Sequence, residues 1–249
     1  MSTSRPGTLE SHSVLVTGGT RGIGKAIAHR LVADGATKAV LGYMRNDEAA
    51  EAAAEELRAT GAEVVLVRGN VADQKTIAEL ASHGPYRAIV SNAATGVVRP
   101  AMETEDKHWD WTLNANARSL LALARACAPT MDEGGSIVAI SSLGSQRVLP
   151  NYVLIGVSKA ALETCVKYLG VELAPRIRVN AVSGGVVDTE ALDWFPNKEQ
   201  MLKTVKRTPA QRLVEPKDMA AVVSFLCSPD AAMICGQTLI VDGGYSLSA

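Results

Sequence analysis

Three glycines near the N-terminus are spaced to form a turn that holds a phosphate. Gly18, Gly22 and Gly24 follow directly after a short apolar run, residues 13–16, and precede a helical pattern. Glycine lets the backbone turn tightly and approach a diphosphate, and the next helix offers free N–H groups and its positive dipole end. Because the turn lies in the strand–turn–helix context that this motif requires, the sequence predicts a dinucleotide-binding site.

The end of the second expected strand indicates which dinucleotide is bound. An acidic residue there would hydrogen-bond the ribose 2′-hydroxyl of NAD, but residues 42–46 read Gly-Tyr-Met-Arg-Asn. Arg45, with Arg21 from the turn, can pair with a 2′-phosphate, which favours NADP or NADPH. Asp47 and Glu48 follow closely, yet they fall where a helix should begin and suit its N-terminus. The alternative is that both arginines are simply solvated.

Strand and helix patterns alternate along the chain. The expected strands are 13–16, 38–42, 63–68, 88–90, 136–141, 178–182 and 238–241, and the expected helices are 23–34, 47–60, 74–82, 105–131, 158–173 and 217–227. This alternation, with nearly continuous apolar strands, predicts an α/β fold: a Rossmann-type doubly wound parallel sheet in three α/β/α layers. We expect one domain over 12–249, preceded by a flexible tail over 1–11.

Composition excludes several classes of protein. A net charge of −1 provides no basic surface for nucleic acid or an anionic membrane. No apolar run reaches the ~18 residues of a membrane span, and the polar N-terminus lacks the apolar core of a signal peptide. The four cysteines form no C-x-x-C pair and the four histidines are scattered, which argues against a disulfide framework or a metal site. We therefore expect a cytoplasmic protein without a metal.

The glycine turn belongs to a series of motifs that covers nearly the whole chain. The series consists of Thr17-Gly18-x3-Gly22-x-Gly24, Asn70-Val71, Asn92-Ala93-Ala94, Asn116, Ser141-Ser142, residues 183–189 (SGGVVDT), 235–237 (CGQ) and 241–244 (VDGG). It resembles the short-chain dehydrogenases/reductases, with two departures: Ala94 replaces a glycine, and Gly184 replaces the proline of the loop over the nicotinamide. Tetramers are usual in that family, so the resemblance implies a homotetramer.

The turn, the arginine pair and the resemblance together define the expected site. The expected coenzyme contacts are Gly18, Thr20, Arg21, Gly22, Ile23, Gly24, Arg45, Asn70, Val71, Asn92, Ala93, Lys159, Gly185, Val187 and Thr189. The resemblance implies that Lys159 binds the nicotinamide ribose and that its charge favours the tyrosinate form of a catalytic tyrosine. It also implies that Asn116 holds a water linked to Lys159 and that Ser142 orients the substrate carbonyl, although Ser141 and Ser145 lie nearby.

A third departure from the family pattern, the position of the catalytic tyrosine, bears directly on the reaction. Most family members place the catalytic tyrosine four residues before the lysine, but here that position is Ile155, and Tyr152 lies seven residues before Lys159. This spacing is typical of enoyl-acyl-carrier-protein reductases. Around residues 99–103, 108–112, 151–159 and 183–185, the chain most resembles the bacterial type III enzymes. The resemblance implies NADPH-dependent reduction of the C=C bond of a 2-enoyl thioester, carried on acyl-carrier protein or coenzyme A, in fatty-acid or polyketide-type biosynthesis.

The displacement of the tyrosine has a chemical reason. On a helix, seven residues are nearly two turns, so Tyr152 and Lys159 can share a face, and moving from four to seven residues shifts the hydroxyl by roughly 4–5 Å. A ketoreductase protonates the oxygen next to the carbon that receives hydride. An enoyl reductase delivers hydride to the β-carbon, and negative charge appears on the more distant thioester oxygen. We therefore expect Tyr152 to stabilise this enolate oxygen, and to act as an acid.

An insertion over 190–208 follows the sixth strand, at the sheet edge where ligands bind in open α/β sheets. Its apolar residues are expected to form a lid over an acyl chain: Leu192, Trp194, Phe195, Met201 and Leu202. The alternative for these residues is packing between subunits. The insertion also carries four cations, Lys198, Lys203, Lys206 and Arg207, which either steer an acidic carrier protein or coenzyme A or form a solvated face.

Two other functions remain open from the sequence. The first is a 3-oxoacyl-thioester or carbonyl reductase of the same superfamily with unusual tyrosine placement. The second is a catalytically silent NADP-binding sensor, because Ile155 interrupts the common motif. Substitution of Tyr152 by Phe tests whether an active enzyme uses this hydroxyl, and inactivity of the wild-type protein on both enoyl and keto thioesters would favour the sensor.

Overall fold

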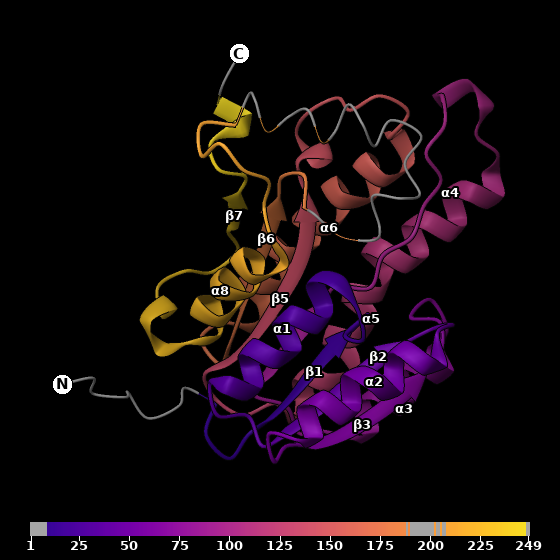
Figure 1. Cartoon of the computed structure of the whole chain (residues 1–249). Coiled ribbons are helices and arrows are strands. Elements are labelled where there is room, and N and C mark those ends of the chain that lie inside the picture. Colours follow the sequence, from indigo (N-terminus) through magenta and orange to yellow (C-terminus); the bar gives the residue numbers. More distant parts are fainter. Residues whose placement is uncertain (1–8, 188, 190–201, 203–204, 206–207, 248–249) are drawn as a thin grey trace.

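A seven-stranded, wholly parallel sheet forms the centre of the molecule (Figure 1). The computed structural model describes residues 9–187, 189, 202, 205 and 208–247. Within them the strand order is β3-β2-β1-β4-β5-β6-β7. The strands are β1 (Ser13–Thr17), β2 (Lys38–Tyr43), β3 (Glu63–Arg68), β4 (Ala88–Ser91), β5 (Gly135–Ser142), β6 (Ile177–Gly184) and β7 (Thr238–Val241). The predicted parallel sheet is therefore confirmed, with strand ends within two residues of those expected.

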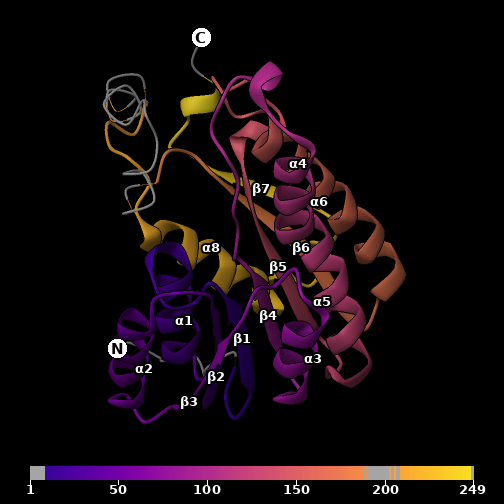
Figure 2. The same cartoon turned by 90° about the vertical axis from the view of Figure 1, so that its right-hand side faces the viewer.

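Helices cover both faces of the sheet (Figure 2). One layer holds α1 (Gly22–Ala33), α2 (Asp47–Arg58) and α8 (Pro216–Cys227), and the other holds α3 (Gln74–Ser82), α4 (Asp106–Leu113), α5 (Ser119–Cys127) and α6 (Val153–Leu173). Because strand side chains alternate between faces, Val14 and Val16 enter the first core and Leu15 enters the second. The three-layer α/β/α fold is thus confirmed.

Two helices differ from the sequence prediction. The single helix expected over 105–131 is divided, because a π turn, η2 (Asn114–Arg118), separates α4 from α5, and a short 3-10 turn, η3 (Ala128–Thr130), ends the segment. The helix expected over 158–173 begins earlier, at Val153. Tyr152 therefore lies immediately before α6 rather than within a helix.

The N-terminal segment differs from the sequence prediction at Leu9. Leu9 is buried in the core of the α1/α2/α8 layer, and its N–H donates to Asp34 O at 3.2 Å. Residues 9–11 thus belong to the folded domain, whereas the rest of the expected tail, 1–8, lies outside the described residues. Among the helices that the structure describes, none combines the length and apolar character needed to cross a membrane.

Candidate active site

A cleft of about 980 Å³ opens at the carboxyl ends of the strands. The chain passes from β1 to β2 and β3 on one side and returns to β4 on the other, and ligands bind at such a reversal in open α/β sheets. Every residue expected to contact the coenzyme lines this cleft, as do Tyr152 and Ser142. The fourth expected catalytic residue, Asn116, is not among the lining residues.

The glycine turn makes a tight cradle at one end of the cleft. A Cβ at Gly24 would lie 2.0 Å from Gly18 O and 2.5 Å from Asn92 Nδ2, so no side chain fits there. Gly18 has a φ of +64°, which favours glycine. The N-cap residue of α1, Arg21, makes no side-chain cap, so the first N–H groups of the helix remain available to an anion. These features fit a coenzyme diphosphate.

The end of β4 is fastened to this turn by Thr17. Its Oγ1 accepts hydrogen bonds from Asn92 N and Ala93 N, both at 3.0 Å. The Asn92 side chain in turn donates to Thr17 O at 3.0 Å and to Gly18 O at 3.1 Å. Sequence reasoning assigned Thr17 no role of its own, although a polar residue at the end of an apolar strand was a usable signal.

Positive charge lies where the adenosine ribose is expected. Arg21 and Arg45 are exposed at the cleft, and neither forms an ion pair within the described part of the chain. The nearby acid, Asp47, is already engaged: it accepts from Tyr43 Oη at 2.9 Å and lies 3.3 Å from Arg68 Nη1. Both arginines are thus available to a 2′-phosphate.

Tyr152 and Ser142 face each other in the cleft. The Tyr152 hydroxyl donates to Ser142 Oγ at 3.4 Å, and Ser142 Oγ also accepts from Gly144 N at 3.3 Å. Burial raises the pKa of Tyr152, with the Ser142 hydrogen bond acting in the opposite direction. The raised pKa favours the protonated hydroxyl, which can donate hydrogen bonds, and the tyrosinate form implied by the resemblance stays a prediction.

Lys159 lines the cleft although its side chain is largely buried. The side chain is buried, and its Nζ donates to Ile140 O at 2.7 Å. Burial lowers the pKa of Lys159 to about 8, against the opposing effect of the Glu163 charge. Four residues before Lys159, Ile155 is buried against Gly96, where a Cβ would lie 2.4 Å from Ile155 Cγ1. The position that holds the catalytic tyrosine in most family members is thus occupied here by a buried, apolar isoleucine side chain.

Three serines lie at or just after the end of β5, and their hydroxyls have different partners: Ser141, Ser142 and Ser145. Ser142 bonds Tyr152, whereas the hydroxyls of Ser141 and Ser145 both lie 2.6 Å from Glu163 Oε1. Glu163 was missing from the expected site. An acidic residue on the buried face of a helix, four residues after Lys159, was the available signal.

Asn116 lies in the π turn and is buried. Its Oδ1 accepts from Thr95 N at 2.8 Å, while its Nδ2 donates to Thr95 O at 2.9 Å and to Ser158 Oγ at 2.8 Å. Both amide hydrogens are therefore used within the protein. The side chain joins the loop after β4 to α6, next to Lys159, and the water expected at Asn116 stays a prediction.

The expected lid lies almost wholly outside the described residues. Of its five members, Leu192, Trp194, Phe195, Met201 and Leu202, the structure describes Leu202, which is partly exposed. The four basic residues of the insertion all lie outside the described residues: Lys198, Lys203, Lys206 and Arg207. The lid and the steering surface thus stay predictions.

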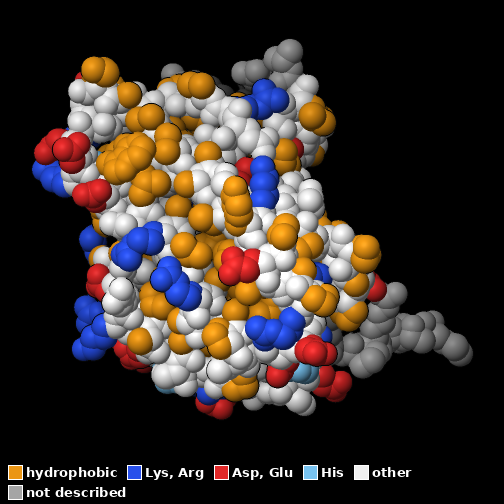
Figure 3. All heavy atoms as spheres, turned by 180° about the vertical axis from the view of Figure 1, so that it is seen from behind, with side chains coloured by type: hydrophobic (Ala, Val, Ile, Leu, Met, Phe, Trp, Pro, Cys, Tyr) orange, Lys and Arg blue, Asp and Glu red, His pale blue; other side chains and the backbone are white. Residues whose placement is uncertain are grey.

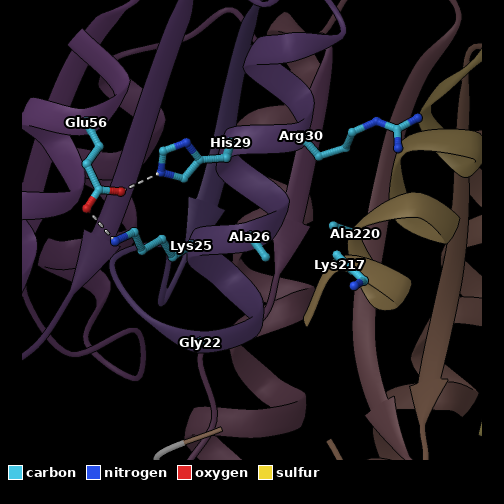
Figure 4. Close-up of a pocket in the computed structure, with 8 residues that line it drawn as sticks. All are labelled: Gly22, Lys25, Ala26, His29, Arg30, Glu56, Lys217 and Ala220. Carbon is cyan, nitrogen blue, oxygen red and sulfur yellow. Dashed lines mark hydrogen bonds and ion pairs between the residues drawn. The ribbon is translucent and has the colours of Figure 1, made fainter. Parts of the chain in front are cut away.

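A second, shallower groove of about 510 Å³ lies between α1, α2 and α8. In Figure 4, Lys25 and His29 both point toward Glu56, at 2.8 and 3.2 Å. Arg30 pairs with Asp34, and Lys217 lies 2.5 Å from Glu215. Because the ionic groups of this groove already have partners, the deeper cleft is the candidate active site.

Comparison with known proteins agrees with this geometry. A family model described as "Enoyl-(Acyl carrier protein) reductase" matches residues 18–246. The chain belongs to the short-chain dehydrogenase/reductase superfamily of oxidoreductases. A 1-cyclohexenylcarbonyl-CoA reductase from Streptomyces collinus is 36% identical over 94% of the chain and 87% of the relative.

Two further relatives show the breadth of this superfamily. The human dehydrogenase/reductase SDR family member 4 is 37% identical over 97% of the chain and 90% of the relative. The crystal structure of a short chain dehydrogenase from Burkholderia cenocepacia in complex with NADP superposes with a TM-score of 0.88 at 32% identity, covering 96% of this chain and 99% of that one. The superfamily and fold implied by the motifs are thus confirmed.

Proposed function

We propose that this protein is an NADPH-dependent reductase of the C=C bond of 2-enoyl thioesters. One observation carries the proposal: the hydroxyl that meets Ser142 in the cleft is that of Tyr152, seven residues before Lys159, while the position four residues before Lys159 is the buried Ile155. The cleft therefore presents the tyrosine hydroxyl of the seven-residue spacing, which is typical of enoyl reductases, and the four-residue position offers no hydroxyl.

The coenzyme preference follows from the charge at the adenosine end. Two exposed arginines, Arg21 and Arg45, flank this part of the cleft, and Asp47 is occupied by Tyr43 and Arg68. A guanidinium pairs strongly with a phosphate, whereas none of the described residues that line the cleft carries a carboxylate for the 2′-hydroxyl of NAD. The solved relative in complex with NADP supports the same choice.

Ser142, Tyr152 and Lys159 have different roles in the proposed reaction. The coenzyme, when bound, supplies a hydride. Ser142 and Tyr152 present hydroxyls that hydrogen-bond the thioester oxygen, and this oxygen gains negative charge as the β-carbon is reduced. The raised pKa of Tyr152, caused by burial, favours the protonated hydroxyl that can donate to that oxygen. Lys159 supplies a positive charge at the cleft. One of its three ammonium hydrogens bonds Ile140 O, and the other two can bind the coenzyme.

The substrate class has independent support from one relative. The Streptomyces collinus enzyme is named as a reductase of 1-cyclohexenylcarbonyl-CoA, whose chemical name denotes an α,β-unsaturated thioester. The coenzyme A or acyl-carrier-protein thioester and the role in fatty-acid or polyketide-type biosynthesis are parts of this proposal that follow from the family resemblance. The cytoplasmic location is a further part of the proposal and rests on the composition of the sequence.

The reaction is tested by following the transferred hydrogen. The protein is incubated with crotonyl-CoA and NADPH deuterated at C4 of the nicotinamide, and the product is analysed by mass spectrometry and NMR. We expect butyryl-CoA with deuterium on the β-carbon. Recovery of unchanged crotonyl-CoA, together with reduction of acetoacetyl-CoA, would replace this proposal with a 3-oxoacyl-thioester reductase.

We also propose a homotetramer, supported by an apolar face on the side of α3 to α6. Figure 3 shows hydrophobic side chains spread over this face among scattered charges. The large exposed apolar residues of its helices are Trp109, Trp111, Leu121, Val153, Val157, Tyr168 and Val171. Sedimentation equilibrium tests the assembly: a mass of four chains is expected, and a monomer would contradict it.

A further inference from the structure

A buried carboxylate lies behind the cleft, on the helix that carries Lys159. Glu163 is 8% exposed and belongs to α6, one turn after Lys159, so the two side chains share a helix face. It is not among the residues that line the cleft, so it is not placed to contact a ligand. A buried charge needs compensating partners, and the partners of Glu163 show what it does.

Within the part of the chain that the structure describes, the hydrogen-bond partners of Glu163 come from one short segment, residues 141–146. Ser141 Oγ and Ser145 Oγ each lie 2.6 Å from its Oε1, and Gln146 Nε2 donates to Oε2 at 3.4 Å. Two hydroxyls at this distance from one oxygen are typical of charge-assisted bonds to a carboxylate. Glu163 thus hydrogen-bonds residues on both sides of Ser142, one immediately before it and two shortly after it.

The same segment determines where Ser142 and Tyr152 meet. Ser145 Oγ, besides its contact with Glu163, lies 2.8 Å from Ser142 O. Gly144, between them, lies directly under the Tyr152 ring, since a Cβ there would be 2.6 Å from Tyr152 Cδ1. A shift of the segment would therefore move Ser142 away from the tyrosine hydroxyl.

Glu163 also acts on Lys159 through space. Burial lowers the pKa of Lys159 to about 8, and the Glu163 charge is the influence that opposes it. Other ionisable groups near the segment are Tyr152, at the start of α6, and Arg147, which turns away to donate to Ser246 O near Asp242. Removal of the Glu163 charge would leave the burial of Lys159 without compensation.

We propose that Glu163 is a positioning residue: as a carboxylate, it holds segment 141–146 and hence Ser142 against α6, and it supplies the counter-charge of Lys159. The kinetic part of this inference rests on the proposed function. The electrostatic part concerns this chain alone and is measurable without substrate.

The electrostatic part is tested by ¹³C NMR of protein with lysine labelled at Cε, with the Lys159 signal assigned from its loss in Lys159→Arg. Glu163→Gln keeps the size of the side chain and removes its charge, while Glu172→Gln removes an exposed charge from the same helix as a matched control. We expect the Lys159 titration to move about one pH unit lower in Glu163→Gln alone. An unchanged midpoint in that variant would overturn the proposal.

The positioning part is tested with Ser145→Ala and Glu163→Asp, which also serve if Glu163→Gln does not fold. Both variants keep the negative charge at residue 163 and disturb the hydrogen bonds between Glu163 and segment 141–146. We therefore expect kcat to fall about tenfold, which corresponds to the loss of one hydrogen bond to a charged group. The Lys159 titration should stay as in wild type. Wild-type kcat in both variants would contradict the positioning role. A wild-type protein inactive on enoyl thioesters would defeat the proposed function, but the NMR titration would still decide the role of Glu163.

Discussion

The Tyr152 hydroxyl donates a hydrogen bond to Ser142 Oγ although Tyr152 lies one residue before the helix that carries Lys159. The two residues come from different sides of a loop, the end of β5 and the start of α6, and they meet above Gly144. The tyrosine is thus positioned by the packing of this loop rather than by the pitch of a helix.

Replacement of Tyr152 by Phe is expected to lower kcat on an enoyl thioester by about 10²–10³, because one donor to the developing oxyanion is lost. Binding of NADPH, measured by fluorescence titration, should be nearly unchanged. Tyr168→Phe is the matched control, since Tyr168 is an exposed tyrosine of α6, the helix that follows Tyr152. A Tyr152→Phe enzyme with wild-type kcat would contradict the mechanism.

The glycine under the tyrosine is expected to be sensitive to a single methyl group. In Gly144→Ala, the new Cβ would lie 2.6 Å from Tyr152 Cδ1 and Cε1, so the ring must move away from Ser142. We expect about tenfold lower kcat and a loss of roughly 1–3 kcal/mol in the free energy of unfolding, as for overpacking of a core. Chemical denaturation and steady-state kinetics measure the two effects. Unaltered kcat would show that the ring position is not critical.

Activity is expected to decline as the pH rises through about 8, the pKa to which burial lowers Lys159. The direction follows from its charge: below this pH the ammonium is protonated and supports the developing negative charge, and above it the amine is neutral. The pH profile of kcat/KM for the enoyl thioester measures this limb. A profile that stays flat up to pH 10 would show that the Lys159 charge is not needed.

Coenzyme preference is expected to depend on Arg45. Arg45→Ala removes a charged partner of the 2′-phosphate, so kcat/KM for NADPH should fall about 10- to 100-fold, equivalent to 1.5–3 kcal/mol. The value for NADH should change little. Arg125→Ala, which removes an exposed arginine of α5 outside the cleft, serves as the control. An unchanged kcat/KM for NADPH would indicate that Arg45 is only solvated, and equal losses with both coenzymes would show that it does not distinguish the 2′-phosphate.

The fold was largely predictable from local patterns, because each strand is an apolar run and most helices end at a glycine or a polar break. The coenzyme end of the cleft was predictable for the same reason: the turn over 17–24 is local in sequence. The π turn was not, since Asn114 and Asn116 fit an ordinary helix and their special backbone depends on the contacts of Asn116 with Thr95 and Ser158.

The catalytic end depended on contacts distant in sequence. Glu163 was missed because its partners, Ser141 and Ser145, lie about twenty residues away, and only the packing of α6 on the end of β5 brings them together. Leu9 was assigned to a loose tail because a lone apolar residue among polar ones gives no periodic signal. In both cases tertiary packing decided the outcome.

The displaced tyrosine predicts C=C reduction, and one comparison tests this most directly. Purified protein with NADPH is offered crotonyl-CoA and acetoacetyl-CoA in parallel, and the loss of NADPH absorbance is followed for each. We expect turnover of crotonyl-CoA that depends on Tyr152, with little or none of acetoacetyl-CoA. Turnover of acetoacetyl-CoA alone would contradict the account and identify a carbonyl reductase that uses Tyr152 in an unusual position.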